Sequence, residues 1–314
     1  MRRAAALLIF PLLAAAAAAG CSSSPSPSSS ANSTNSSVTA TGKFGTAPKV
    51  TIPAKKAGTS LYTKTLIQGN GAVLSTADTL EGNFVLYDWS GTTHKLLGST
   101  FTQGGPTLFA GSMLPGLEKA LIGQKLGSRV LAVIPPKDAF GAQGNSQIGV
   151  KGTDTLVFVI DMDKLFVNTS GVSGTQATNG GGALPTVIST TGAPTVNIPA
   201  TSPPKALTVK PLITGTGPKV KSGQEVLVQY TGINWRTKKV FDSSWSRKQP
   251  YTTPIGVGQV LPGWDKGLVG QPVGSRVLLV IPPADGYGKT GSASAGIKGT
   301  DTLVFVVDIM AAVG

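Results

Sequence analysis

Lys151-Gly-Thr-Asp-Thr-Leu-Val-Phe-Val159 recurs without a change as Lys298-Gly-Thr-Asp-Thr-Leu-Val-Phe-Val306. A second stretch, Gly127-Ser-Arg-Val-Leu-Ala-Val-Ile-Pro-Pro136, recurs with one substitution as Gly274–Pro283. Both pairs are offset by 147 residues, so the sequence between them aligns without a gap. Chance does not produce two such matches at one offset. The chain is therefore a tandem duplication of a unit of about 100 residues, the size of one small domain.

Each unit is dominated by strand signals. In the second unit, β-branched and aliphatic runs bounded by glycine and proline predict strands. These runs are Ala206–Val209, Glu225–Tyr230, Arg276–Ile281 and Thr302–Asp308.

One stretch of the second unit, Pro262–Val269, has helical character. Pro262 stands at a first helical position, Trp264 and Leu268 fall on one side, and Gly270 follows as a stop. The first unit has the same pattern at Pro115–Ile122. A helix this short is not stable alone, so its apolar side must pack against the sheet. The sequence predicts an α+β domain in which a mostly antiparallel sheet wraps around one short helix.

The N-terminus predicts export. Arg2 and Arg3 precede the apolar stretch Ala4–Ala19, which is short for a membrane span and ends in small residues. Ala18-Ala-Gly-Cys21 resembles a bacterial lipobox, although a lipobox usually has leucine in the place of Ala18. We therefore expect a lipoprotein signal peptide at 1–20 and lipidation of Cys21. The alternative is an ordinary signal peptide with an incidental cysteine.

Two further segments predict flexible connections. Residues 21–57 are rich in serine, proline and threonine, and we expect a disordered tether to the membrane there. Residues 168–204 are rich in glycine, threonine and proline and are expected to form a linker. The two domains would then occupy 58–167 and 205–314.

Composition argues against several classes of protein. Cys21 is the one cysteine, so the chain forms no disulfide within itself. His94 is the one histidine and has no neighbouring cysteine or carboxylate pair, which argues against a metal site. The net charge of +13 is spread thinly, without a basic stripe interleaved with aromatic residues, and does not favour nucleic-acid binding.

Five motifs of the second unit resemble those of the FKBP-type peptidyl-prolyl cis/trans isomerases, in the family's order and spacing. They are Val228-Gln-Tyr-Thr-Gly232, Val240-Phe-Asp-Ser-Ser244, Val260-Leu-Pro-Gly-Trp264, Ile281-Pro-Pro-Ala-Asp-Gly-Tyr-Gly288 and Thr302-Leu-Val-Phe305. The resemblance implies two FKBP-like domains, each with an antiparallel sheet of five or six strands around one short helix. It also implies an enzyme that rotates X-Pro bonds.

The resemblance further implies a pocket lined by Tyr230, Phe241, Asp242, Arg247, Tyr251, Val260, Leu261, Trp264, Tyr287, Ile297 and Phe305. Trp264 would form its floor, and Phe241 and Phe305 its walls. The Tyr287 hydroxyl and the Ile297 N–H would hold substrate carbonyls, while Tyr230 and Arg247 would orient Asp242. Two alternatives stay open: Asp242 could only stabilise a turn, and Arg247 could be a solvated charge.

This chemistry requires little of the protein beyond a shaped site. Amide resonance raises a barrier of about 18–20 kcal/mol to rotation about an X-Pro bond. No bond breaks, so no nucleophile, metal or cofactor is expected. A dry aromatic pocket disfavours the charge-separated planar amide and so lowers the barrier.

The first unit lacks part of this set when it is aligned by the same registers. Tyr87 aligns with Tyr230, but the other counterparts are changed: Leu97-Gly98 for Phe241-Asp242, Gln103 for Arg247, Leu117 for Trp264 and Phe140 for Tyr287. We expect the first unit to fold and to have little or no isomerase activity.

The sequence as a whole predicts an extracytoplasmic, lipid-anchored folding catalyst that acts on proline-containing exported polypeptides. The resemblance adds macrolide FKBP ligands as a second class of partner. A non-enzymatic chaperone or protein-binding lipoprotein that uses the same pockets is the alternative, and a cell-wall spacer is a third class.

Overall fold

The computed structural model describes residues 34–102, 104–110, 113–177, 182–188 and 192–314. The described residues divide into two compact units, one within 34–71, 84–99 and 110–161, the other within 72–83, 100–109 and 162–314. The predicted signal peptide, the lipobox and Cys21 lie outside the described residues. In the described part, no helix has the length and apolar character to cross a lipid bilayer.

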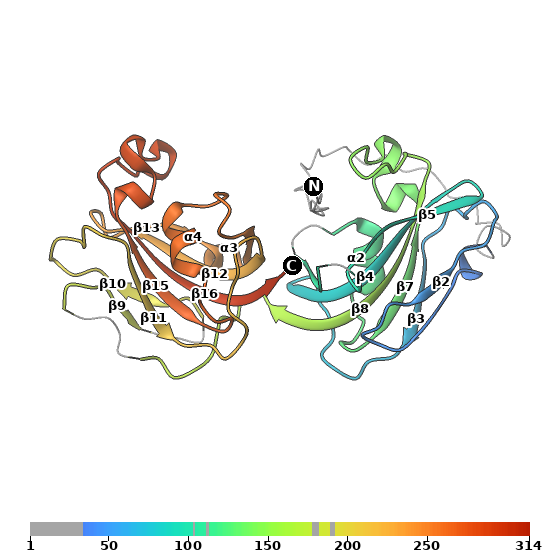
Figure 1. Cartoon of the computed structure of the whole chain (residues 1–314), viewed down its shortest axis with the longest axis horizontal. Coiled ribbons are helices and arrows are strands. Elements are labelled where there is room, and N and C mark those ends of the chain that lie inside the picture. Colours follow the sequence, from blue (N-terminus) through green and yellow to red (C-terminus); the bar gives the residue numbers. More distant parts are fainter. Residues whose placement is uncertain (1–33, 103, 111–112, 178–181, 189–191) are drawn as a thin grey trace, which may run out of the picture. The chain divides into compact units, whose positions relative to one another are not determined.

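The first repeat forms a six-stranded sheet (Figure 1). The order along the sheet is β3, β7, β8, β4 and β5, and β6 also pairs with β4. The elements of this repeat are β3 (Tyr62–Ile67), β4 (Asp78–Ser90), β5 (Thr93–Ser99), β6 (Thr107–Phe109), α2 (Pro115–Leu121), β7 (Arg129–Ile134), the 3-10 turns η1 (Pro136–Asp138) and η2 (Gly141–Gln143), and β8 (Thr155–Val167).

The second repeat forms a sheet of the same order, namely β11, β15, β16, β12 and β13, with β14 paired to β12. Its elements are β11 (Thr208–Ile213), β12 (Glu225–Asn234), β13 (Val240–Ser243), α3 (Ser244–Arg247), β14 (Tyr251–Pro254), α4 (Pro262–Leu268), β15 (Arg276–Ile281), the 3-10 turns η3 (Pro283–Asp285), η4 (Gly288–Thr290) and η5 (Ala293–Ala295), and β16 (Leu303–Val313). Neighbouring strands run antiparallel. The predicted fold class is confirmed.

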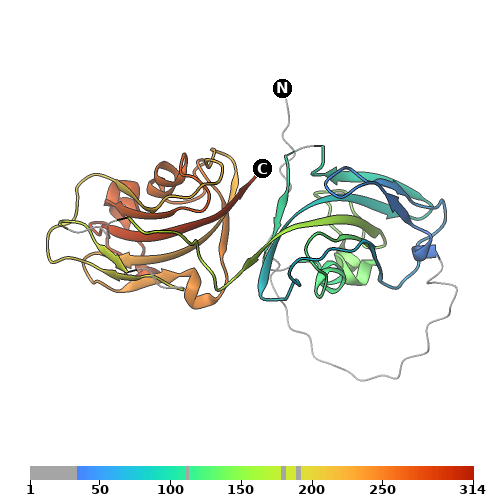
Figure 2. The same ribbon diagram turned by 90° about the horizontal axis from the view of Figure 1, so that it is seen from below.

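Helix α4 covers the inner face of the second sheet (Figure 2). Pro262 begins the helix without a capping side chain, and Trp264 and Leu268 are buried. They pack into one cluster with Val277 and Leu279 of β15. Because successive strand residues face opposite sides, Leu278 and Val280 must be covered from the outer face.

A hairpin covers that outer face. Strands β9 (Thr186–Ile188) and β10 (Thr195–Asn197) pair with each other, and Val187 is fully buried. Val187 shares a cluster with Leu278, Val280 and other outer-face residues of the sheet. Residues 182–188 and 192–204 are thus part of the fold, and the prediction of a flexible linker is wrong for them.

The first repeat has the same device. Strands β1 (Thr39–Thr41) and β2 (Lys49–Thr51) form a hairpin whose flanking residues Val38 and Ile52 pack against Leu131 on the outer face. The predicted tether is therefore ordered from residue 34 to residue 57. The sheet carries continuous apolar runs, so it needs cover on both faces, and these segments supply it.

The hairpins belong to the duplicated unit itself. Ala47-Pro-Lys-Val-Thr-Ile-Pro-Ala54 matches Ala193-Pro-Thr-Val-Asn-Ile-Pro-Ala200 at an offset of 146 residues. A hydrogen bond that joins the segment after each hairpin to the sheet also recurs at this offset. The Trp89 indole N–H donates to the Lys55 carbonyl at 3.0 Å, and the Trp235 indole N–H donates to the Thr201 carbonyl at 3.2 Å.

Each sheet also contains a buried ion pair. In the second repeat, Arg276 Nε and Nη2 donate to the two carboxylate oxygens of Asp308 at 2.6 and 2.7 Å. Arg129 and Asp161 make the same two-pronged contact in the first repeat. All four side chains are almost completely buried. Removing either partner would leave an uncompensated charge, so both pairs are constraints on the fold.

We expect the β9–β10 cover to be required for stability. Val187→Asp would place a charge among outer-face aliphatic side chains and lower the free energy of unfolding by at least about 2 kcal/mol. Ile188→Asp is the matched control, because Ile188 is adjacent and 50% exposed. Urea unfolding followed by tryptophan fluorescence measures both variants. Equal midpoints for the two would show that residues 182–188 and 192–204 are a linker after all.

Candidate functional site

A pocket of about 750 Å³ opens on the inner side of the second sheet, next to α4. Ten of the eleven residues predicted from the sequence line it. The lining residues are Tyr230, Phe241, Asp242, Arg247, Tyr251, Gln259, Val260, Leu261, Pro262, Trp264, Tyr287 and Phe305. Gln259 and Pro262 were not predicted, although their position in the stretch that leads into the helix could have suggested them.

A bulge brings two neighbouring residues of β13 into the pocket. Neighbours in a regular strand face opposite sides of the sheet. Here Gly232 pairs with Asp242 while Ile233 pairs with Val240, so Phe241 is an extra residue in the ladder. The interruption allows both the ring of Phe241 and the carboxylate of Asp242 to line one pocket.

Four of the six aromatic residues that line the pocket pack against one another. The Trp264 ring centroid lies 5.3 Å from those of Tyr230 and Phe305, at interplanar angles of 84° and 89°. Phe241 meets Phe305 edge-on, with centroids 5.5 Å apart. Edge-to-face contacts of this kind fix the rings in place. Trp264 is only 4% exposed and lines the open pocket, so it forms its floor.

Gly232 allows two of these rings to meet. A Cβ at this position would lie 2.8 Å from Phe305 and 2.9 Å from Phe241. Those distances are shorter than any ordinary carbon contact, so a larger residue would push the walls apart.

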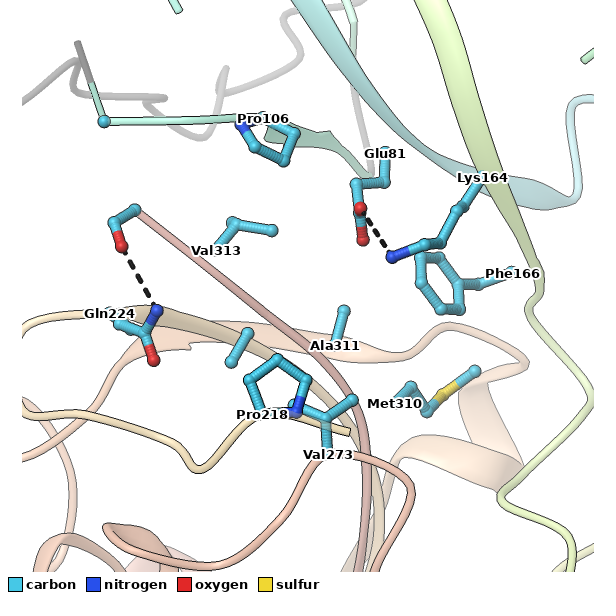
Figure 3. A pocket seen from close by; sticks show the side chains of 13 residues that line it. Glu81, Pro106, Lys164, Phe166, Pro218, Gln224, Val273, Met310, Ala311 and Val313 are labelled. Atoms are coloured by element: carbon cyan, nitrogen blue, oxygen red, sulfur yellow. Dashed lines mark hydrogen bonds and ion pairs between the residues drawn. The ribbon is translucent and has the colours of Figure 1, made fainter. Parts of the chain in front are cut away.

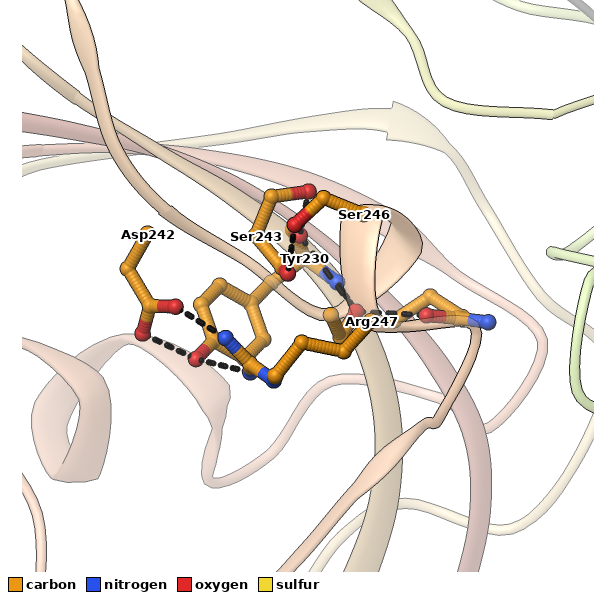
Figure 4. Close-up of polar contacts among 7 residues, drawn as sticks. Tyr230, Asp242, Ser243, Ser246 and Arg247 are labelled. Atoms are coloured by element: carbon orange, nitrogen blue, oxygen red, sulfur yellow. Dashed lines mark hydrogen bonds and ion pairs between the residues drawn. The ribbon is translucent and has the colours of Figure 1, made fainter.

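A polar triad lies at one side of the pocket (Figure 4). The Tyr230 hydroxyl and Arg247 Nη1 both donate to the Asp242 carboxylate, and Arg247 Nη2 donates to the Tyr230 oxygen at 2.9 Å. The structure thus brings Asp242 and its two expected partners together. Burial and the hydrogen bond to Asp242 raise the pKa of the Tyr230 hydroxyl. Burial also raises the pKa of the Tyr287 hydroxyl, with a contribution from the negative charge of Asp242.

The loop before α4 is held by one carboxylate. Asp265 accepts hydrogen bonds from the backbone N–H groups of Gly256 and Gly258 at 2.6 and 2.8 Å. These bonds anchor the loop that presents Val260 and Leu261 to the pocket.

Ile297 does not have the predicted role. It is buried in the core cluster, and its backbone N–H donates to the Ser292 carbonyl at 2.9 Å in a local bridge. That N–H is therefore not available to a ligand in this structure. The Leu261 N–H, beside the pocket, has no acceptor among the described residues and is the better candidate donor.

The inner face of the first repeat is filled differently. Leu117, 4% exposed, stands on α2 where Trp264 stands on α4. Leu86 pairs with Gly98 as Gly232 pairs with Asp242, so leucine replaces the glycine that lets the walls meet.

The alignment of Tyr87 with Tyr230 is wrong. Tyr87 lies on the outer face, packed with the cluster that includes Trp89. Two residues before Leu86, Phe84 occupies the place of Tyr230, and its ring lies 5.9 Å from that of Phe158. Aligning Tyr87 with Tyr230 because both are tyrosines shifts this strand by three residues from the alignment that the structure shows. A shift by an odd number of residues moves a strand residue to the other face of the sheet.

A smaller hollow of about 310 Å³ is lined by residues of the compact unit made of 72–83, 100–109 and 162–314, which includes parts of both repeats (Figure 3). Its charged groups, Glu81 and Lys164, pair with each other at 3.0 Å. The remainder is mostly aliphatic, with Phe166 as its one aromatic ring. It lacks the converging rings and polar groups of the larger pocket, which is the stronger site.

Comparison with known proteins agrees with this geometry. The family model described as FKBP-type peptidyl-prolyl cis-trans isomerase matches residues 76–163 and again residues 217–310. An FK506-binding protein of Streptomyces anulatus is 41% identical over 118 residues, which are 38% of this chain and 95% of that protein. A probable FK506-binding protein of Corynebacterium glutamicum is 37% identical over 119 residues, 38% of this chain and 98% of that protein. Rat peptidyl-prolyl cis-trans isomerase FKBP9 is 27% identical over 239 residues, 73% of this chain and 34% of that protein. Both hairpins lie outside the matched ranges of the family model.

The raised pKa of Tyr230 predicts a loss of stability at alkaline pH. The folded state holds the Tyr230 proton more tightly than the unfolded chain does, so the stabilisation is complete below about pH 10 and declines as pH rises toward the folded pKa. We expect the free energy of unfolding to fall more steeply above pH 10 in the unmodified protein than in Tyr230→Phe. Urea unfolding at pH 9, 10 and 11 measures this, and parallel slopes would contradict it.

Proposed function

Because the chain belongs to the FKBP-type peptidyl-prolyl cis-trans isomerase family, which both repeats match, we propose that its isomerase activity resides in the second unit. The observation that carries the proposal is the open pocket with Trp264 at its floor and Phe241 and Phe305 at its walls. A proline ring is an apolar, compact group that such a floor accommodates.

The catalytic step in this proposal is preferential binding of the twisted amide. Planar amides are stabilised by charge separation that water solvates, and the aromatic walls withhold that solvation. The Tyr287 hydroxyl, at the edge of the pocket, and the Leu261 N–H are the donors we propose for substrate carbonyls. No proton has to leave the substrate, which suits a tyrosine whose pKa is raised.

Asp242 acts by its charge in this scheme. Tyr230 and Arg247 hold its carboxylate in a fixed orientation at the side of the pocket. As the amide twists, its carbonyl carbon loses conjugation and becomes more electrophilic, and a fixed carboxylate nearby stabilises that polarity. The pair with Arg247 is partly exposed, so its electrostatic contribution is modest.

The magnitudes favour the rings over the hydrogen bonds. An acceleration of a thousandfold to ten-thousandfold corresponds to about 4–5.5 kcal/mol of barrier. The net contribution of one hydrogen bond is about 0.5–1.5 kcal/mol. Only the part of it that is gained in the transition state lowers the barrier. Shape and exclusion of water therefore supply the larger share.

For the first unit we propose a folded domain with little or no isomerase activity. Leu117 and Leu86 replace the indole floor and the glycine between the walls, and Gly98 replaces the carboxylate of Asp242. Aliphatic packing is retained, so the fold does not depend on the lost groups.

We propose exported polypeptides as clients and the outer surface of the cell membrane as the location. The basic residues Arg2 and Arg3, the apolar stretch Ala4–Ala19 and Cys21 support this proposal. Several acyl chains on one cysteine would hold the protein where a single chain would hold it weakly.

Substitutions in the pocket test the assignment to the second unit. In the full chain we expect Trp264→Ala to lower kcat/KM for X-Pro isomerisation at least about tenfold, and Asp242→Ala about two- to tenfold. Exchange NMR of a proline peptide measures the rate without a coupling protease. Inhibition by FK506, the ligand in the relatives' names, provides a second readout and should be lost with Trp264→Ala.

Leu117→Ala is the matched control, because Leu117 has the same place on α2 and the same exposure. It removes packing without touching the proposed pocket and should leave the rate unchanged. If activity instead falls with Leu117→Ala and persists with Trp264→Ala, the first unit is the catalyst.

The proposed lipid anchor has its own test. Expressed in a bacterium that makes lipoproteins, the unmodified chain should incorporate radiolabelled palmitate and sediment with membranes. Cys21→Ser should abolish the label and release the protein from the membrane fraction. Labelling that persists in Cys21→Ser would refute the anchor at this residue.

A further inference from the structure

The second domain carries an excess of positive charge. Residues 205–314 contain thirteen lysine and arginine side chains and six aspartate and glutamate side chains. The structure describes all of these residues, so the partner of each carboxylate can be identified.

Each aspartate of this domain is already engaged within the protein. Asp308 pairs with Arg276, Asp301 with Arg236, and Asp285 with Lys266 at 2.5 Å. Asp242 pairs with Arg247, and Asp265 accepts two backbone N–H groups. The remaining acid, Glu225, begins β12, and burial raises its pKa.

Two lysines close in sequence to pocket-lining residues lack such partners. Lys248 directly follows the pocket-lining Arg247, at the end of α3, and has a left-handed backbone with φ of 54°. Lys289 lies in η4, two residues after the pocket-lining Tyr287. Both side chains are exposed, and no described carboxylate lies within ion-pair distance of either.

The two segments that carry these lysines both contribute a lining residue to the pocket, Arg247 in one and Tyr287 in the other. Asp242 forms an ion pair with Arg247, which precedes Lys248. Tyr287, two residues before Lys289, lines the same pocket as Asp242, whose charge contributes to the raised pKa of the Tyr287 hydroxyl. Both segments therefore meet near Asp242, whose own charge Arg247 balances.

The first repeat serves as an internal control for a structural role. Its ion pairs Lys119–Asp138 and Arg129–Asp161 match Lys266–Asp285 and Arg276–Asp308, so these two pairs occur in both copies. At the positions of Lys248 and Lys289, the first repeat has Gly104 and Ala142. The lysines occur only in the copy that has the aromatic pocket.

We propose that Lys248 and Lys289 make the second unit select proline substrates with acidic residues close to the X-Pro bond. This inference rests on the proposed isomerase function and adds the substrate class. Two unpaired ammonium groups attract a carboxylate on the bound peptide and repel a cationic one. Because both groups are exposed, the preference is modest and depends on salt.

The test compares three peptides that are identical except for the residues flanking a central Ala-Pro-Phe, which are glutamate, glutamine or lysine. Exchange NMR on the full chain gives kcat/KM for each peptide at 20 mM and 500 mM NaCl. We expect the glutamate peptide to exceed the glutamine peptide about two- to tenfold at low salt and the lysine peptide to be slowest. The differences should largely vanish at high salt.

The variant Lys248→Gln/Lys289→Gln should lose the preference while the rate for the glutamine peptide stays unchanged. Lys205→Gln/Lys210→Gln makes the same change in net charge and should keep the preference. Lys210 pairs with Leu278, an outer-face residue, and so lies on the side of the sheet away from the pocket.

The outcomes separate the two proposals. If the protein accelerates the glutamate, glutamine and lysine peptides equally, the charge preference is overturned and the isomerase function stands. A preference that survives in Lys248→Gln/Lys289→Gln would assign it to other residues and overturn the inference as well. If no peptide is accelerated, the proposed function fails and the inference fails with it.

Discussion

The structure depends on one constraint, which is that the central strands of each sheet are apolar on both faces. In the second repeat, Val277, Leu279 and Ile281 face the helix, while Leu278 and Val280 face away from it. An antiparallel sheet of this kind cannot leave either face in water. Helix α4 covers one face, and the hairpin β9–β10 covers the other. The buried Arg276–Asp308 pair adds a polar contact that tolerates little displacement.

The pocket uses the side of the sheet that the helix leaves partly open. The positions of its side chains are set by irregular features in otherwise regular strands and loops. The bulge at Phe241 turns two neighbouring residues inward, and Gly232 leaves room for two rings to meet. Asp265 ties the preceding loop to the helix. These features position the rings before any substrate arrives, which is the condition for a site that acts by shape and by exclusion of water.

The two repeats separate what the fold requires from what the site requires. The covering hairpins, the indole contacts to them and the buried ion pairs occur in both copies. The indole floor, the glycine between the walls, Lys248 and Lys289 occur in one. Aliphatic residues such as Leu86 and Leu117 fill the corresponding space in the first copy, because a sheet face without a pocket still has to be packed. The two copies therefore share the sheet with its covering hairpin and buried ion pair, and they differ in the side chains on the inner face of the sheet.

The sequence by itself determined the duplication, the antiparallel sheet, the short helix that carries Trp264 and ten of the twelve residues that line the pocket, because strand runs and local motifs are written along the chain. Only the tertiary structure decided which segments cover the outer faces. Short polar hairpins at 39–51 and 186–197 look like linkers until the apolar face beneath them is known. It also decided that Phe84, not Tyr87, corresponds to Tyr230, and that the Ile297 N–H is already bonded. Strand register and hydrogen-bond partners depend on residues far apart in the sequence, so no local pattern could specify them.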